Sequence, residues 1–315
     1  MKSEWKERRL LTKTAQMYYE ENKTQQEIAN RYGVSRPSIS RFLQKAREKG
    51  IVEIKINSEF SFTGLEKELE DKYDLREVII IPSEKDSMLK RSLAEAAATY
   101  LVRILKDKDI VGVSWGRTLV HIPQYIEGVN KDVTFVPIVG GVGQSILDIH
   151  SNQIVINLAR AFNGKWELLH VPVIVDSSDL RDSLLSDTNI RHCIKLGSNA
   201  DVALIGIGAP LAPNPTILET GYYTDAILND LKASGAVCDL CSVFIDKEGK
   251  VCDTELNQRV ISISLDSLKN IPTVIGVAGG EEKHEAILAA LKGHYIDVLI
   301  TDENTGEFLL GSIGG

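Results

Sequence analysis

The sequence contains few aromatic residues, few cysteines and no long apolar segment. Aromatic side chains make up 6% of its 315 residues, so Leu, Ile, Val and Ala must build the core. No apolar run approaches the roughly 18 residues of a membrane-spanning helix, and the charged N-terminal segment is not followed by the apolar stretch of a secretory signal. Four cysteines in a chain of this length form no disulfide framework. We therefore expect a reduced, cytoplasmic protein that makes no membrane contact.

Length and charge indicate two parts with different partners. The length is typical of two domains, and 43% apolar with 25% charged residues is typical of a folded globular protein. Residues 1–57 carry 13 basic and 7 acidic side chains, a net charge of +6, whereas the remaining 258 residues carry 23 basic and 37 acidic side chains. A basic segment on an acidic body indicates that the segment meets a polyanion. A helical segment can also be basic for solubility alone, so the residue pattern must decide.

Residues 24–50 have the pattern of a helix-turn-helix. Thr24 and Glu27 form a predicted capping box, which starts a first helix. Gly33 can take the left-handed conformation that ends it. Pro37 stands where the first turn of a second helix would tolerate it. Val34 fills the predicted turn, and the apolar faces of the two predicted helices are Ile28, Ala29, Tyr32, Ile39, Phe42, Leu43 and Ala46. An ordinary helical hairpin would have no reason to place a polar and basic row on the opposite face, so the pattern favours DNA binding.

The second predicted helix would lie in the major groove of DNA. Its exposed side chains would contact base edges, and those near the helix ends would contact phosphates. The predicted DNA-binding residues are Gln25, Ser35, Arg36, Ser38, Ser40, Arg41, Gln44 and Lys45, with Thr24 and Lys49 as further phosphate contacts. We expect a preceding helix over residues 5–21 and a short strand over Ile51–Asn57, as one arm of a wing. One such head binds DNA weakly, which implies a dimer or a larger oligomer.

The body, residues 58–315, alternates predicted strands and helices. A polar connecting helix is expected over residues 62–73, and further helices over 152–162, 180–185 and 282–291. The predicted strands are Val78–Ile81, Ile110–Ser114, Val133–Val139, Leu168–Val175, Val202–Ile207, Val243–Ile245, Val274–Ala278 and Val298–Thr301. Apolar runs without polar alternation indicate strands buried on both faces. We therefore predict an α/β fold with a mostly parallel, Rossmann-like sheet.

Glycine-containing turns follow four of these strands and predict a ligand site. The carboxyl ends of parallel strands meet at one edge, where ligands bind, and glycine lets a backbone approach a ligand closely. A helix N-terminus and a nearby cation would favour a phosphate. The predicted effector contacts from these turns are Ser114, Gly116, Arg117, Thr118, Gly140, Gly141, Gly206, Gly208 and Lys283. The turns therefore favour a phosphorylated sugar or polyol as the ligand.

Asp239 and the cysteines around it have several interpretations. The Asp239 carboxylate could accept hydrogen bonds from sugar hydroxyls, or it could serve as a cap or a surface turn residue. Cys238 and Cys241 lack the second ligand pair of a structural zinc site, and the segment after them continues as a strand rather than the helix of a thioredoxin-like motif. Buried free thiols are the expected outcome. The sequence predicts no metal site, no catalytic residue and no cofactor.

These motifs, taken in order, resemble those of the SorC family of bacterial transcriptional regulators. They are the helix-turn-helix, SWGRT (114–118), GGVG (140–143), GIGAP (206–210), GAVCDLC (235–241) and AGGEEKHEAILAALKGHYIDVLITD (278–302). The resemblance implies a sugar or sugar-phosphate sensor that regulates a carbohydrate-utilisation operon and is commonly a tetramer. It also implies an effector domain similar to sugar-phosphate isomerases of the glucosamine-6-phosphate deaminase type, and it assigns effector contacts to the turn residues above and to Asp239.

Two other functions stay open at this point. The chain could be a sugar-phosphate isomerase or deaminase with a DNA-targeting head, because proteins with the same fold can have different functions, depending on their site residues. Isomerisation needs a positioned base and a proton shuttle near the sugar carbonyl. Asp148, His150, Asp239 and Glu281 lie near the predicted loops but form no evident acid–histidine arrangement. A purely structural DNA-binding protein is the third possibility, although it leaves the glycine turns unexplained.

Overall fold

The computed structural model describes residues 2–53, 62–141, 150–213, 215 and 224–311. The chain forms two compact units, Met1–Phe60 and Ser61–Gly315, which are described separately below. No helix in the described part of the chain combines the length and the apolar character that a membrane crossing requires.

The first unit is a bundle of three helices, α1 (Lys2–Tyr19), α2 (Gln25–Tyr32) and α3 (Arg36–Glu48). The predicted capping box is present, since the Thr24 hydroxyl accepts the Glu27 N–H and the Glu27 carboxylate accepts the Thr24 N–H. Gly33 follows α2 with φ 64° and ψ 32°, the left-handed conformation expected of it. The fully buried residues between the helices include Ile28, Ala29, Ile39, Leu43, Leu11 and Ala46. These contacts hold α2 and α3 in the helix-turn-helix arrangement.

The second unit is built on a parallel sheet of seven strands in the order β1-β9-β8-β5-β2-β3-β4. The strands are β1 (Glu77–Ile81), β2 (Ile110–Val113), β3 (Thr134–Pro137), β4 (Lys165–Trp166), β5 (Val202–Gly206), β8 (Val274–Val277) and β9 (Val298–Asp302). All paired strands of this sheet run in the same direction, so their carboxyl ends share one edge. The predicted α/β class and parallel sheet are therefore confirmed.

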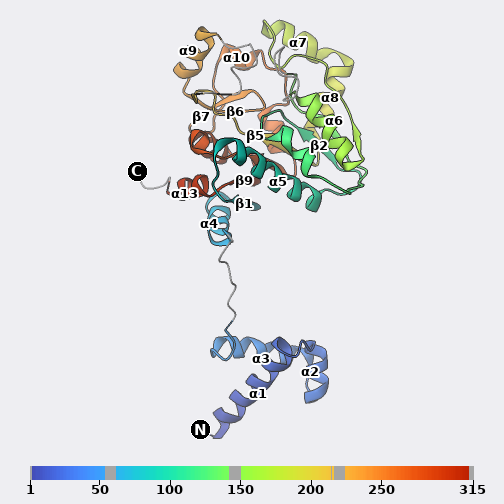
Figure 1. The fold of residues 1–315 in the computed structure, drawn as a ribbon, viewed down its shortest axis with the longest axis vertical. Helices are drawn as coiled ribbons and strands as arrows, with labels where there is room; N and C mark the ends of the chain where they lie inside the picture. Colours follow the sequence, from blue (N-terminus) through green and yellow to red (C-terminus); the bar gives the residue numbers. More distant parts are fainter. Residues whose placement is uncertain (1, 54–61, 142–149, 214, 216–223, 312–315) are drawn as a thin grey trace. The chain divides into compact units, whose positions relative to one another are not determined.

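Helices cover both faces of the sheet (Figure 1). One face packs against α5 (Asp86–Ile104), the 3-10 helix η1 (Leu119–Tyr125) and α6 (Ser151–Phe162), around a core that includes Leu101, Phe135 and Phe162. The other face is covered by α4 (Thr63–Tyr73), α8 (Thr188–Ser198), α12 (His284–Lys292) and α13 (Glu303–Gly311). The remaining helices are α7 (Ser178–Ser186), α9 (Asp225–Ala233), α10 (Glu255–Gln258), α11 (Leu265–Lys269) and the 3-10 turn η4 (Glu281–Lys283).

A two-stranded antiparallel sheet, β6 (Ala236–Leu240) and β7 (Val243–Asp246), joins the main sheet at its carboxyl edge. Gly208 and Asp239 exchange two backbone hydrogen bonds of 2.9 Å each, which fix β6 beside the loop after β5. Cys241 and Ser242 form the tight turn between β6 and β7, with φ values of 53° and 66°. Two consecutive positive φ values are the geometry of a type I′ hairpin turn. The hairpin thus brings Asp239 to the edge where ligands bind.

The edge strand β1 is protected by the connecting helix α4. The carboxylates of Glu66 and Glu70 accept the backbone N–H groups of Ile80 and Val78, each at 2.9 Å. These N–H groups would otherwise form an open sheet edge, which invites pairing with another chain. The i, i+4 spacing on the helix therefore matches the i, i+2 spacing on the strand.

Two predicted strands differ from the structure. Residues 168–175 form no regular strand but exchange single bridges with Gly141 and Val260. Pro172 lies in the middle of this segment and lacks the N–H that a central ladder needs. In the wing predicted over Ile51–Asn57, residues 51–53 form no strand, and residues 54–57 lie outside the described part of the chain. Strands β4 and β6 were not among the predicted elements.

Candidate functional site

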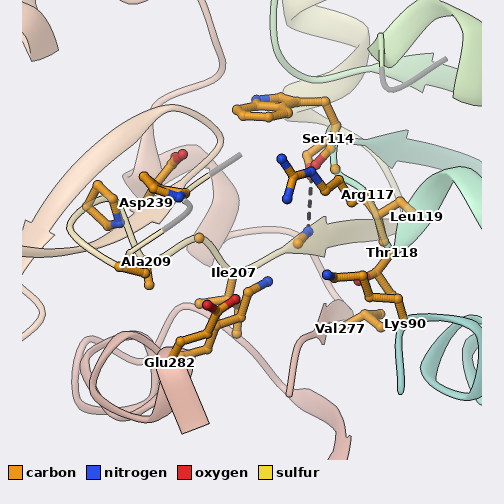
Figure 2. A pocket seen from close by; sticks show the side chains of 18 of the residues that line it. Lys90, Ser114, Arg117, Thr118, Leu119, Ile207, Ala209, Asp239, Val277 and Glu282 are labelled. Atoms are coloured by element: carbon orange, nitrogen blue, oxygen red, sulfur yellow. Dashed lines mark hydrogen bonds between the residues drawn. The ribbon is translucent and has the colours of Figure 1, made fainter. Parts of the chain in front are cut away.

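A pocket opens at the carboxyl ends of β2, β5 and β8 (Figure 2). Its walls come from the turn after β2, the loop after β5, the β6–β7 hairpin, the start of α12 and helix α5. Counting its open mouth, the pocket encloses about 780 Å³. Open α/β sheets bind their ligands at this edge, so the pocket is the candidate ligand site.

The structure brings most of the predicted effector residues together in this pocket. The lining includes eight of them: Ser114, Gly116, Arg117, Thr118, Gly206, Gly208, Asp239 and Lys283. They come from four separate segments, so only the fold makes them neighbours. These residues lie together because the carboxyl ends of parallel strands share one edge of the sheet, as expected from the sequence.

Gly140 and Gly141 are not part of the described pocket lining. A Cβ at Gly140 would approach the backbone of Pro172 to 2.7 Å, and a Cβ at Gly141 would approach the His150 imidazole to 2.1 Å. Close packing against backbone therefore requires glycine at Gly140, whereas at Gly141 the nearest atoms belong to a side chain that can move. Residues 142–149, which include Gly143 and Asp148, lie outside the described residues.

Ser114 organises two strand ends at the base of the pocket. Its side chain is 2% exposed, and its hydroxyl accepts the N–H of Gly206 at 3.2 Å (Figure 2). The same hydroxyl donates to the Trp115 carbonyl at 3.4 Å. These bonds tie the turn after β2 to the end of β5. The contribution of Ser114 to the site is therefore a fixed arrangement of the two backbone segments.

Asp239 lies in the wall of the pocket with its carboxylate held by the hairpin turn. Its Oδ1 atom accepts the N–H of Ser242 at 2.7 Å, and the Ser242 hydroxyl accepts the indole N–H of Trp115 at 3.0 Å. Burial raises the pKa of Asp239 to about 7, although the Ser242 N–H and the charge of Lys283 act in the opposite direction. A carboxylate so placed is a strong acceptor for ligand hydroxyl groups.

Three cationic side chains line the pocket: Lys283, Arg117 and Lys90. All three are half-buried, and the side chain of Lys90 reaches the pocket from α5 (Figure 2). Burial lowers the pKa of Lys283, and the positive charge of Lys90 lowers it further, while Glu282 and Asp239 raise it. Two lysines close enough to influence each other attract an anion between them.

Several pocket residues were not predicted from the sequence. Lys90 lies within a long helix and carries no turn or glycine signal, and Trp115 and Leu119 look like ordinary core residues. Pro210, Ala212 and Pro215 line the side formed by the loop after β5. A Pro- and Gly-rich segment after a strand was the available signal for that loop.

The cysteines and histidines form no second chemical site in the described structure. All four cysteines are free and buried, as expected. Burial raises the pKa of Cys238 and Cys241, which keeps both thiols protonated and unreactive. No group of three His, Cys, Asp or Glu residues within the described ranges has the geometry of a metal site.

The first unit presents the predicted DNA-binding side chains along α2 and α3. Arg36, Ser40, Arg41, Gln44 and Lys45 are exposed, as is Ser35 at the cap of α3, while Gln25 and Ser38 are half-buried. The opposite side of α3 is closed by the buried Ile39, Leu43 and Ala46. The helix therefore has one face for the core and one face for a partner.

Glu7 of α1 holds two of the basic side chains of this surface. Its carboxylate accepts hydrogen bonds from Lys49 at 2.8 Å and from Lys45 at 3.3 Å. The two lysines keep the pKa of Glu7 below its usual value. These pairs fix the C-terminal end of α3 against α1.

Comparison with protein families gives two matches that follow the two units. Residues 59–311 match the family described as "Putative sugar-binding domain". Residues 15–49 match sigma-70 region 4, a family model that covers the helix-turn-helix segment.

Individual relatives cover the whole chain. The chain is 34% identical to the deoxyribonucleoside regulator of Bacillus subtilis over 96% of this chain and 98% of that protein. It is 33% identical to the sorbitol operon regulator of Klebsiella pneumoniae, with the same coverage. The crystal structure of that full-length regulator superposes with a TM-score of 0.76 over 96% of this chain and 99% of the other. These relatives are transcriptional regulators and not enzymes, which decides between the functions that the sequence left open.

Proposed function

The chain belongs to the SorC family of sugar-binding transcriptional regulators, and from this premise we propose that it controls a carbohydrate-utilisation operon in response to a phosphorylated sugar. In this proposal residues 1–57 bind the operator, and residues 58–315 bind the effector and hold the subunits together. The relatives named above have different names, a deoxyribonucleoside regulator and a sorbitol operon regulator, so the effector class of this chain must be argued from its own pocket residues.

The distribution of charge in the pocket is the observation that supports a phosphate group on the ligand. Among the described residues, Lys283, Lys90 and Arg117 line one pocket together with two carboxylates, Glu282 and Asp239. A dianionic phosphate would relieve the repulsion between the lysines, and its oxygens can accept several hydrogen bonds at once. The Thr118 hydroxyl can donate a hydrogen bond to a phosphate oxygen, and the glycine turns let the backbone approach the ligand closely. The phosphate end of the ligand therefore belongs at the cations.

Asp239 would hold the sugar end of the same ligand. Its carboxylate is oriented by Ser242, and Gly208 lies directly beside it, where a Cβ would come within 3.1 Å of the Asp239 Cβ. Hydroxyl groups of the ligand would donate to this carboxylate, and their positions on the sugar would decide which sugars fit. Trp115, Ile207 and Val277 supply apolar walls around the carbon skeleton.

The operator is read by the exposed face of α3. Arg36, Ser38, Arg41 and Gln44 would contact base edges, while Gln25, Ser35, Ser40 and Lys45 would contact the backbone. Paired half-sites require paired heads, so we infer a homo-oligomer, a tetramer by analogy with the family, with its subunits held together by the effector domain. Such a regulator acts in the cytoplasm, where the operator is.

Calorimetry with matched phosphorylated and free sugars tests the proposal. Full-length protein should bind the phosphorylated member of a pair at least about tenfold more tightly, because each charge-assisted hydrogen bond to phosphate contributes of order 1.5–3 kcal/mol. Lys283→Ala should lose this preference and keep its operator affinity in the absence of sugar.

Lys292→Ala is the matched control for this experiment. Lys292 lies at the opposite end of the same helix, where it pairs with Glu248 at 3.4 Å, so its loss leaves the pocket intact. Equal affinity for both sugar forms, or an unchanged preference in Lys283→Ala, would mean that the ligand is not recognised through a phosphate at these cations.

A further inference from the structure

The turn between β8 and α12 has a conformation that only glycine adopts easily. Gly280 has φ 96° and ψ 147°, and a Cβ on Gly279 would lie 2.4 Å from Oδ1 of Asp302. Two consecutive glycines have high conformational freedom, so such a turn is not rigid on its own. Lys283 ends the short 3-10 turn η4 that follows Gly280, and its N–H donates to the Gly280 carbonyl at 2.9 Å, so the position of its side chain depends on how the turn is held. Some other group must therefore fix the turn.

Asp302, the last residue of β9, makes the contacts that fix this turn. Its Oδ1 atom accepts the N–H of Gly280 at 2.8 Å and the hydroxyl of Thr305 at 2.6 Å, and its Oδ2 atom accepts the hydroxyl of Ser83 at 2.9 Å. The Ser83 hydroxyl in turn accepts the N–H of Asn304 at 2.9 Å. The carboxylate thus joins the glycine turn, the start of α13 and the segment after β1.

This carboxylate is buried and ionised. Asp302 is 2% exposed, and although burial opposes ionisation, the hydrogen bonds from Thr305, Gly280 and Ser83 keep its pKa below the usual value. Hydrogen bonds to an ionised acceptor are roughly twice as strong as neutral ones. The network can therefore offset the freedom of the glycine pair.

We propose that Asp302 is a positioning residue for effector binding: it holds the Gly279-Gly280 turn so that Lys283 meets the anionic group of the ligand. The inference rests on the proposed phosphate site and adds a residue to it. Asp302 lies in a hollow beside the pocket that shares Lys283 and Lys90 with it. Both of its oxygens are occupied by protein donors, and its negative charge repels an anion, so it acts through the turn and not by touching the ligand.

The sign of the electrostatic effect makes the inference testable. Replacing Asp302 by Asn removes a negative charge near the cations, and on charge alone phosphate binding would become tighter. If the carboxylate positions the turn, the weaker bonds to the neutral amide release it, and phosphate binding becomes weaker. A loss of affinity in Asp302→Asn therefore cannot be a simple charge effect.

Asp297→Asn provides a matched control on the same pair of strands. The Asp297 carboxylate accepts the N–H of Val274 at 2.7 Å, at the opposite end of β8 and β9. Each substitution thus replaces a carboxylate that accepts a backbone N–H, from Val274 at the start of β8 or from Gly280 in the turn after β8. Only Asp302 lies beside the pocket. A general loss of stability would affect phosphate binding in both variants.

The experiment titrates inorganic phosphate into the full-length protein and follows binding by calorimetry, with Lys283→Ala defining the phosphate bound elsewhere on the chain. We expect the Lys283-dependent dissociation constant to rise about fivefold in Asp302→Asn, the difference between a charged and a neutral hydrogen bond. Asp297→Asn should bind phosphate as the parent protein does. Ser83→Ala removes the donor to Oδ2 and the acceptor of the Asn304 N–H but keeps the Asp302 carboxylate and its bond to Gly280. It should give a smaller loss, and it replaces Asp302→Asn if that variant does not fold.

Each outcome distinguishes this inference from the proposed function. Parent-like or tighter binding in Asp302→Asn, or equal losses in the two Asp→Asn variants, overturns the positioning role and leaves the phosphate site standing. If that variant does not fold, unchanged binding in Ser83→Ala overturns the role. If Lys283→Ala binds phosphate as the parent does, the phosphate site itself fails and the positioning role fails with it.

Discussion

The ionisation of Asp239 should destabilise the folded protein in a way that a single substitution reveals. Burial raises the pKa of Asp239 from 3.8 to about 7. Each unit of such a shift corresponds to 1.36 kcal/mol, so the ionised carboxylate costs the fold at most about 4 kcal/mol above neutral pH. Asp239→Asn removes the titration and keeps an oxygen that can accept the Ser242 N–H. The variant should therefore be more stable than the parent at alkaline pH.

The direction of the pH dependence follows from proton binding. Between the unfolded pKa near 4 and the folded pKa of about 7, the folded chain holds a proton on Asp239 that the unfolded chain has lost. The stability from this group is therefore present at low pH and is lost as the pH rises to about 7. Between pH 5.5 and 8.5 the parent should lose about 2 kcal/mol relative to Asp239→Asn, since only the portion up to about pH 7 contributes.

Urea unfolding at the two pH values measures this difference. The fluorescence of Trp115 and Trp166 reports the transition of the effector domain, and the stability difference between variant and parent cancels the titration of other groups. Asn stabilises the variant by about 2 kcal/mol more at pH 8.5 than at pH 5.5 if the reasoning holds. An identical difference at both pH values would show that Asp239 has an ordinary pKa and does not face a low-dielectric pocket wall. A carboxylate that destabilises the fold is expected at a binding site and not in a purely structural turn.

Three further predictions concern the first unit and the assembly. Arg41→Ala should weaken specific operator binding by about 1–3 kcal/mol, which is the contribution of a good base contact. Lys49→Ala should instead weaken binding to all DNA sequences alike. If a gel-shift titration shows that Arg41→Ala has unchanged operator affinity, the recognition surface lies elsewhere. Thr24→Ala removes the hydroxyl that accepts the Glu27 N–H and keeps the backbone N–H that donates to the Glu27 carboxylate. The variant should lower the stability of the first unit by about 0.5–2 kcal/mol in thermal unfolding, while no loss would mean that the cap is not formed in solution. A fragment that starts near residue 62 should remain oligomeric in light scattering, and a monomeric fragment would place the subunit interface in the first unit.

Local signals explain the parts of the protein that the sequence alone predicted. The helix-turn-helix depends on short-range rules, namely the cap at Thr24, the glycine at Gly33 and the apolar spacing of α3, and each of these was found where it was predicted. The parallel sheet follows from uninterrupted apolar runs between helices. Once the strands are parallel, their carboxyl ends must share an edge, so the turns at Ser114, Gly206 and Lys283 meet without knowledge of their distances.

Long-range packing decided the rest. Lys90 enters the pocket because α5 packs across the sheet, and nothing within its own helix signals that position. Gly140 has the same turn pattern as the pocket glycines, but it is needed because the backbone of Pro172, 32 residues further along the chain, packs against it. Asp302 ends a strand and looks like an ordinary helix cap, and only the folded chain places its carboxylate against Gly280. A sequence pattern records which backbone conformations are allowed, whereas a binding site depends on which segments meet, and that is settled by the packing of the whole core.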